Sequence, residues 1–400
     1  MIYLDYAAAT PVSEKALRAM EPFFTEDFFN PSAAYYPAKL VREKYETAKN
    51  EIAHLIGAKG TDLVMTSGAT ESNELAFSSL LTPVNQKVQA RNQTPQNLPE
   101  VLVLETEHAA VLENAKRFSN ALVKVDKNDL IILDDLKKKL SPATRLISVS
   151  LANNELGTIQ PLAEIAELVR SERMNRLRRG NLTPLYLHSD ASQALNLIDI
   201  SVARLGVDLL TLNSAKVYGP KGVGALYVAH GVKLSPVFLG GGQENGLRSG
   251  TENVPGVIGF ATAFAEAKKH LSSSRKTYEK LTKILETELK QSKIEPKFLK
   301  HKKSSLANFC PVCFPGLDAE RLIYKLEEQG VLLSTGAACA ASKGKKSHVL
   351  KAIGLSDAEI AGSLRISLGR LNTEDNVREA GRLIREAVDE ECNRIGEGDE

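Results

Sequence analysis

TLNSAKVYGPKGVGALYV, residues Thr211–Val228, places a lysine between two short apolar runs and just before a Gly-Pro turn. We expect one strand to end near Leu212 and a second strand at Ala225–Val228. Lys216, beside the end of the first strand, is well placed to form a Schiff base with a carbonyl cofactor. The alternative on this stretch alone is a solvated loop lysine, which is our interpretation of Lys221.

Similar short apolar runs recur before this stretch and alternate with amphipathic segments such as Pro161–Arg170 and Val202–Leu205. Continuous apolar strands that alternate with helices favour an α/β fold with a mainly parallel sheet covered on both faces. The predicted strands are Leu63–Thr66, Val101–Glu105, Ala121–Val125, Leu146–Leu151, Leu185–Ser189, Leu209–Leu212 and Ala225–Val228.

The pattern of apolar and charged residues changes after about Pro255. A long amphipathic helix is expected at Phe260–Gln291, and it leads into a second, smaller α+β domain. Its predicted elements are a strand at Leu306–Phe314, a helix at Asp318–Gln329, a strand at Leu364–Leu368 and a helix from Thr373. We therefore expect a large domain at 14–258 and a small domain made of 1–13 and 259–400. Pro83–Glu100, rich in Gln, Asn and Pro, is expected to be a surface excursion.

The composition, with 43% hydrophobic and 25% charged residues, is that of a globular protein. A formal net charge of +2 gives no reason to expect nucleic acid or membrane lipid as a partner. No signal peptide or membrane span is visible, and four cysteines are too few for a disulfide framework. These features predict a reduced, cytoplasmic protein.

Three further segments carry candidate functional residues. In TSGATESNELA (Thr66–Ala76) a strand runs into small residues and a helix start, where free amides and the Thr70 hydroxyl would bind an anion. In HSDASQALN (His188–Asn196), Asp190 stands at the carboxyl end of a strand, where α/β proteins bind ligands. An ordinary helix N-cap is the alternative in both cases. The glycines of GGGQENGLRSGTENVPG (240–256) suggest backbone that passes close to another group.

LSTGAACAASKGKKSHVL (Leu333–Leu350) holds a cysteine, Cys339, among small residues that give its thiol no bulky apolar neighbours. The lysines that follow, Lys343, Lys345 and Lys346, would favour a thiolate or an acidic partner. By contrast, Cys310 and Cys313 lie three apart on a predicted strand, about 10 Å from each other. That separation exceeds what a disulfide spans, so we interpret both as structural. Cys392 is regarded as incidental, and no metal site is expected.

The motifs, taken together in the order in which they occur along the chain, resemble those of the cysteine desulfurases of the NifS/IscS class. These are pyridoxal-phosphate enzymes of transferase fold type I, with a mainly parallel seven-stranded sheet in the large domain. The matching motifs are YLDYAAATPV (3–12), NPSAA (30–34), TSGATESNELA, TEHAAVL (106–112), NNELGTIQP (153–161), SDASQ, AKVYGPKGVGALYV, GGGQENGLRSGTEN, STGAAC and RISLGR (365–370).

The resemblance implies roles for individual residues. Lys216 would hold the cofactor, Asp190 would pair with its ring nitrogen, and His108 would stack on the ring and move protons. The resemblance also implies contacts to the cofactor phosphate from Ala69, Thr70, Asn213, Ser214 and, from the other subunit, Thr251. Asn154 and Gln193 would contact the oxygen on the ring. Arg365, with Asn30 and Asn154, would bind the substrate carboxylate, and Cys339 would accept the sulfur.

Three positions differ from the usual sequence of the family that this chain resembles. Ala215 stands where a histidine usually donates to the phosphate, so this chain either lacks that hydrogen bond or makes it from Ser214. Tyr35 lies near the place of a common histidine, and Ala109 replaces a usual lysine.

The implied activity is conversion of L-cysteine to L-alanine with a persulfide on Cys339, for iron–sulfur cluster assembly or tRNA thiolation. A homodimer and sulfur-acceptor proteins are implied as partners. The alternatives are a selenocysteine lyase, an aminotransferase, which would need no loop thiol, and a non-catalytic scaffold, which only Ala215 supports.

Overall fold

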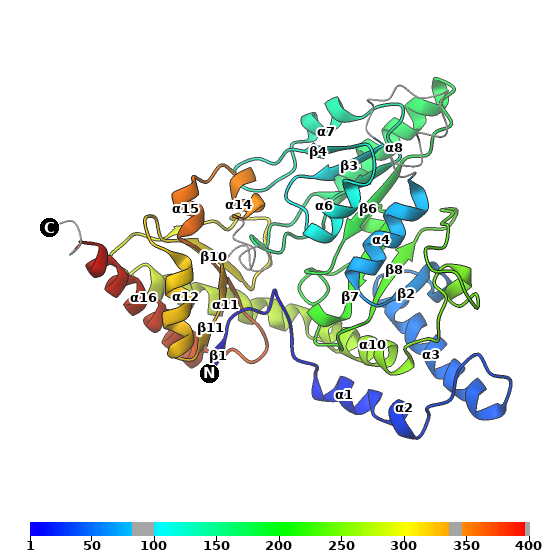
Figure 1. Ribbon diagram of the computed structural model, residues 1–400, viewed down its shortest axis with the longest axis horizontal. Helices are drawn as coiled ribbons and strands as arrows, with labels where there is room; N and C mark the ends of the chain where they lie inside the picture. The colour runs from blue at the N-terminus through cyan, green and yellow to red at the C-terminus, as the bar shows by residue number, and fades with distance from the viewer. Residues whose placement is uncertain (82–99, 336–345, 397–400) are drawn as a thin grey trace.

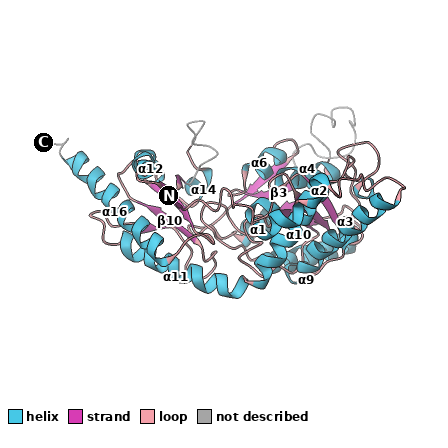
Figure 2. Ribbon diagram, turned by 90° about the horizontal axis from the view of Figure 1, so that it is seen from below, coloured by secondary structure: helices cyan, strands magenta, loops and turns pink. Residues whose placement is uncertain are grey.

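The computed structural model describes residues 1–81, 100–335 and 346–396. Two parts lie side by side and are joined by two consecutive helices, α10 (Val254–Lys269) and α11 (Leu271–Leu289) (Figure 1, Figure 2). Cys339 and nearly all of the predicted surface excursion at 83–100 lie outside the described residues.

The larger part is built on a seven-stranded sheet of order β2-β8-β7-β6-β5-β3-β4. Only β8 runs antiparallel to its neighbours, β2 and β7, and every other adjacent pair is parallel. The strands are β2 (Leu63–Thr66), β3 (Val101–Leu104), β4 (Asn120–Val123), β5 (Leu146–Ser148), β6 (Tyr186–Asp190), β7 (Leu209–Asn213) and β8 (Gly224–Val228). The predicted α/β fold with a mainly parallel sheet is confirmed, and each predicted strand is present with small shifts at its ends.

Helices cover both faces of this sheet because its strands are apolar on both sides. In β2, for example, Val64 packs toward α4 (Ala69–Leu80) and α6 (Ala109–Ala115), whereas Leu63 and Met65 pack on the opposite face. That opposite face is covered by α3 (Tyr36–Leu55), α8 (Leu162–Arg178), α9 (Val202–Leu205) and α10. The remaining helices of the larger part are α1 (Glu14–Met20), α2 (Pro22–Thr25) and α7 (Leu133–Lys139).

The smaller part has its own core between a four-stranded antiparallel sheet and three helices, α11, α12 (Ala319–Glu328) and α16 (Glu374–Gly396). The sheet order is β12 (Ser334–Thr335), β13 (Ser363–Ser367), β10 (Phe309–Cys313), β9 (Lys297–Phe298). A separate parallel pair joins β1 (Ile2–Tyr3) to β11 (Val331–Leu332), and two short helices, α14 (His348–Ala352) and α15 (Asp357–Ala361), complete it. The expected small α+β unit is thus present, and the amino-terminal segment starts in it and then crosses to α1 (Figure 1).

The single helix predicted at Phe260–Gln291 is in fact two helices that meet at the non-helical His270 (φ −101°, ψ 6°). Phe260 and Phe264 of α10 pack in the core of the larger part, whereas Leu281 and Leu285 of α11 pack in the smaller one. The break lets each helix turn its apolar stripe toward its own core. Our predicted boundary at 258/259 falls inside α10, so we propose to place it at His270.

Cys310 and Cys313 are free and buried in β10, where burial raises the pKa of both thiols. The Cys313 thiol donates to the carbonyl oxygen of Glu359 at 3.1 Å. Among the described residues, no cluster of three His, Cys, Asp or Glu side chains is arranged to hold a metal ion. In the same part of the chain, no helix has the length and apolar content needed to cross a membrane.

Candidate active site

The predicted site residues follow strand ends at one edge of the large sheet. Asp190 ends β6, and the turn that holds Lys216 (Ser214–Lys216) directly follows β7. His108, Asn154 and the start of α4 come after β3, β5 and β2 in the same way. Because these strands all run in one direction, their carboxyl ends meet at a single edge, where α/β proteins bind ligands.

Lys216 and Gln193 meet at the amino-terminal segment. The Lys216 Nζ donates to the carbonyl oxygens of Ala7, at 2.8 Å, and Ala8, and the Gln193 Nε2 donates to the same Ala7 oxygen at 2.9 Å. The Thr10 hydroxyl adds a bond to the carbonyl of Ala215 at 3.0 Å. The segment that begins the chain therefore lies against the lysine turn, which the sequence alone did not predict.

Asp190 is held by a chain of buried hydrogen bonds. Its carboxylate accepts from the Asn73 Nδ2 at 2.9 Å, and the Asn73 Oδ1 accepts from the Thr211 hydroxyl at 2.7 Å. Because the Thr211 hydroxyl donates its only hydrogen to Asn73, it can only accept from the His188 Nε2, which lies 3.0 Å away. The His188 Nδ1 in turn accepts from the Ser148 hydroxyl at 2.8 Å. Burial lowers the pKa of His188 to about 4, although the negative charge of Asp190 acts to raise it. The ring is therefore neutral, as this arrangement of donors and acceptors requires.

Sequence inspection assigned no role to Asn73, His188 or Thr211, although all three lie in the quoted motifs. A usable signal was present at Thr211, a polar residue between the apolar, buried Leu210 and Leu212. His188 gave a weaker signal, because Ser189 follows it in β6.

His108 lies among charged groups from both parts of the molecule. Desolvation lowers its pKa most, and the charges of Lys216, His348 and Arg365 lower it further, while Asp190 raises it. The ring caps α6 by accepting from the Ala110 amide at its Nδ1 (3.1 Å). A neutral His108 therefore carries its proton on Nε2. The residue remains accessible to solvent, although surrounding atoms desolvate the ring enough to lower its pKa.

Arg365 lies in the middle of β13 and is 4% exposed. Its guanidinium connects the amino-terminal segment to the loop that follows β5. Its Nη2 pairs with the Asp5 Oδ1 at 2.8 Å, and its Nη1 donates to the carbonyl of Asn154 at 3.2 Å. Its Nε is buried without a hydrogen-bond partner among the described residues. Ser334 pairs with Arg365 in the sheet, and Thr335, the last described residue before the segment 336–345 that includes Cys339, pairs with the adjacent Leu364.

The amino end of α4 has the form expected for an anion site. Gly68 precedes the helix with φ 148°, and Ala69 and Thr70 begin it, with Thr70 exposed. A side chain at Gly224 would lie 2.8 Å from the Gly68 Cα, so glycine at 224 allows this close approach of the helix start to β8.

The glycine-rich segment 240–256 is anchored to its surroundings, which disfavours a loose linker. The buried Glu244 accepts from Tyr45, from the Lys49 Nζ at 2.7 Å and from the Met65 amide at 2.8 Å. Arg248 pairs with Glu71 on α4 at 2.9 Å.

Four of the predicted site residues are placed differently from the rest. Ser214 is fully buried and its hydroxyl faces Gly219 without a hydrogen-bond partner among the described residues. Of the two alternatives for the position of Ala215, this burial favours the loss of the phosphate contact over its replacement by Ser214. Asn213 caps the lysine turn by accepting from the Ala215 amide at 3.2 Å. Asn30 and Thr251 are exposed and, within the described chain, make no hydrogen bond to the other predicted residues.

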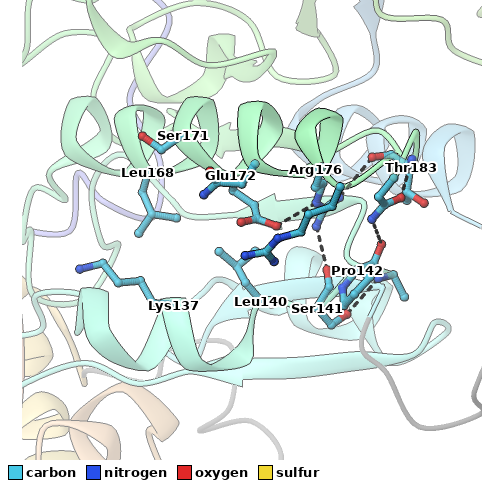
Figure 3. Close-up of a pocket in the computed structure, with 13 residues that line it drawn as sticks. Lys137, Leu140, Ser141, Pro142, Leu168, Ser171, Glu172, Arg176 and Thr183 are labelled. Atoms are coloured by element: carbon cyan, nitrogen blue, oxygen red, sulfur yellow. Dashed lines mark hydrogen bonds and ion pairs between the residues drawn. The ribbon is translucent and has the colours of Figure 1, made fainter.

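A cavity of about 820 Å³ lies between α7 and α8 and is lined by none of the predicted site residues (Figure 3). The buried Arg176 in its wall donates to the carbonyls of Ser141, Thr144 and Thr183, so its guanidinium holds these connections together. We propose that the chemistry takes place at the strand ends, where the charged groups converge, and not in this cavity.

Comparison with known proteins places this fold and site in a class. A model of the aminotransferase class-V family matches residues 2–379. The chain is 39% identical over 384 residues to "Cysteine desulfurase IscS 1" of Archaeoglobus fulgidus, with 94% of each chain covered. Two solved structures are also similar. A NifS-like protein has TM-score 0.83, 32% identity and coverage of 96% of this chain and 98% of that one. "SspA in complex with cysteine" has TM-score 0.76, 32% identity and coverage of 92% and 99%.

The fold is thus that of a class-V aminotransferase-type enzyme. Within that class, the chain belongs to the IscS/NifS family of cysteine desulfurases. The family is pyridoxal-phosphate dependent, which agrees with the resemblance seen in the motifs.

Proposed function

We propose that this chain binds pyridoxal phosphate, converts L-cysteine to L-alanine and receives the sulfur as a persulfide on Cys339. The observation that carries the proposal is the convergence of Lys216, Asp190, His108 and Arg365 on one sheet edge. The strand that leads toward Cys339 pairs with Arg365 at the same place. A similar solved protein is described in complex with cysteine, which supports this substrate.

The residues present fit the cofactor. The Lys216 amine reaches into the site, and Asn73 holds the Asp190 carboxylate where it can pair with a protonated ring nitrogen. The amino end of the twelve-residue helix α4, with Ala69 and Thr70, fits the phosphate. When bound, pyridoxal phosphate supplies an electron sink for the negative charge that develops on the substrate carbon.

Each of the remaining side chains has a separate role in the proposed reaction. Arg365 binds the substrate carboxylate, Lys216 as a free amine moves the Cα proton, and His108 moves a proton at Nε2. The Cys339 thiolate attacks the substrate sulfur, so that a sulfur–sulfur bond forms as the carbon–sulfur bond breaks. The electron pair stays on the substrate carbon, which takes up a proton and leaves as alanine.

We further propose a cytoplasmic homodimer. Large apolar side chains are exposed along α1, α2, the connection that follows α2 and the start of α3, namely Leu17, Phe24, Phe28, Tyr35 and Tyr36. A second copy would cover them, and exposed Thr251 would then reach the phosphate of the neighbouring subunit. The sulfur would pass to an iron–sulfur scaffold or a sulfur carrier for tRNA thiolation.

The deciding experiment is incubation of the purified, cofactor-loaded protein with L-cysteine, followed by measurement of alanine and of sulfide with and without reductant. Equal amounts of alanine and sulfur, with a persulfide mapped to Cys339, are expected. Cys339→Ser should abolish sulfide release and keep the cofactor absorbance, and continued release would refute the role of Cys339. Faster release from selenocysteine than from cysteine would favour a selenocysteine lyase.

A further inference from the structure

The first turn of α14 is fastened to the larger part by two side chains. The Ser347 hydroxyl caps the helix by accepting from the Leu350 amide at 3.1 Å, and it donates to the Glu155 Oε2 at 2.5 Å. Next to it, the His348 Nε2 donates to the carbonyl oxygen of Glu107 at 2.9 Å. Ser347 is 2% and Glu155 6% exposed, so the bond between them is shielded from water. We call these two contacts the α14 clasp.

The clasp attaches at two positions beside predicted site residues. Glu155 follows Asn154, whose carbonyl accepts from Arg365, and Glu107 precedes His108. The apolar side chains of α14 support the same placement, because Val349 and Leu350 are buried in the core of the larger part. Figure 1 shows α14 on the side of the smaller part that faces the large sheet.

The clasp also lies where the chain returns from the segment that includes Cys339. Residues 336–345 are followed by Lys346 and then by Ser347. The other end of that segment follows β12, which pairs with Arg365. Both points of attachment are therefore fixed by residues that touch the proposed substrate site.

We propose that Glu155 is a positioning residue for sulfur transfer, which acts through Ser347 by fixing where the Cys339 segment rejoins the fold beside Asn154 and Arg365. This inference rests on the proposed function, in which Cys339 takes the sulfur. Without Glu155 the Ser347 hydroxyl would lose its acceptor, and without Ser347 the buried Glu155 carboxyl would lose this donor, so loss of either residue is expected to release the start of α14. A small displacement of a reacting group is enough to slow a reaction that depends on alignment.

The first test is hydrogen exchange of the full-length protein, read on the peptide that covers α14. Ser347→Ala and Glu155→Ala should both speed exchange there, whereas Glu155→Gln keeps an acceptor and should restore protection. Ser356→Ala is the matched control, since Ser356 caps the equally short α15 by bonds within its own segment. Faster exchange confined to α15 is expected for that control. Unchanged exchange of α14 in both Ser347→Ala and Glu155→Ala would overturn the clasp.

The second test separates positioning from general loss of structure. Ser347→Ala and Glu155→Ala should form the Cys339 persulfide about tenfold more slowly with little change in KM. L-Cysteine sulfinate serves as the comparison, because its sulfur leaves as sulfur dioxide without a thiol acceptor, and its turnover should stay near that of the wild type. An equal fall for both substrates, or an equal effect of Ser356→Ala, would overturn the positioning role. Absence of persulfide in the wild type would instead refute the proposed function, while hydrogen exchange would still decide on the clasp.

Discussion

Asp5 and Arg365 form a partly buried ion pair that joins the amino-terminal segment to the middle of β13, with 2.8 Å between the Asp5 Oδ1 and the Arg365 Nη2. The two residues are 360 positions apart in the chain. The pair fixes the direction of the guanidinium, whose Nε has no hydrogen-bond partner among the described residues. We propose that this arginine binds the substrate carboxylate. Asp5 is therefore expected to orient the arginine, although it belongs to neither the sheet edge nor the Cys339 segment.

Replacement of Asp5 should weaken substrate binding. In Asp5→Ala, Arg365 loses its partner and its fixed direction, so kcat/KM for cysteine should fall about tenfold or more, mainly through KM. Asp5→Asn keeps an oxygen for the Nη2 and should lose less. Steady-state alanine production measures both, and equal values for Asp5→Ala and wild type would contradict the role.

The buried chain from His188 to Asp190 should govern cofactor retention. Thr211→Val removes the proton donated to Asn73 and the acceptor of His188, which should cost about 1–3 kcal/mol of unfolding free energy and speed cofactor loss. Thr282→Val is a matched control, because Thr282 is also buried and donates to the Ala307 carbonyl in the other core. Urea unfolding and dialysis followed by absorbance measure the two effects. If the control loses cofactor equally fast, the chain of hydrogen bonds has no specific role.

Asp129 should make stability depend on pH. Burial raises its pKa to about 8, although Thr106 and Thr158 oppose the rise. Between about pH 4 and 8 the folded chain holds a proton that the unfolded chain has released, so stability is lost as pH rises through this window. Relative to Asp129→Asn, the wild type should lose about 1.4 kcal/mol per pH unit. Urea unfolding at pH 6 and 7 measures the slope, and parallel slopes would contradict the prediction.

Gly224 should be needed for the close approach of α4 to β8. In Gly224→Ala the added Cβ would lie 2.7 Å from the Leu212 carbonyl oxygen and 2.8 Å from the Gly68 Cα, which are backbone atoms that cannot move aside cheaply. We expect a loss of about 1–3 kcal/mol and weaker phosphate binding. In the control Gly241→Ala, the new Cβ meets only the side chain of Gln243, which can rotate away. Thermal unfolding with and without pyridoxal phosphate compares the two variants, and similar losses would refute the prediction.

Much of the fold could be predicted from the sequence because strand and helix signals are local. The apolar runs that became β2 and β7 lie within a residue of their predicted ends, and Lys216 and Asp190 stand at strand ends as expected. The break at His270 could not be predicted, because one continuous amphipathic pattern conceals that its two halves face different cores.

The order of residues along the chain establishes which polar side chains follow which apolar run, and that Cys339 stands among small residues. Packing in three dimensions settles which of these polar groups meet. The Asp5–Arg365 pair, the Ser347–Glu155 bond and the burial of the Ser214 hydroxyl all depend on sheet register and on how the two parts pack. A buried polar group must find a partner wherever packing brings one, and no local pattern of residues records that distance.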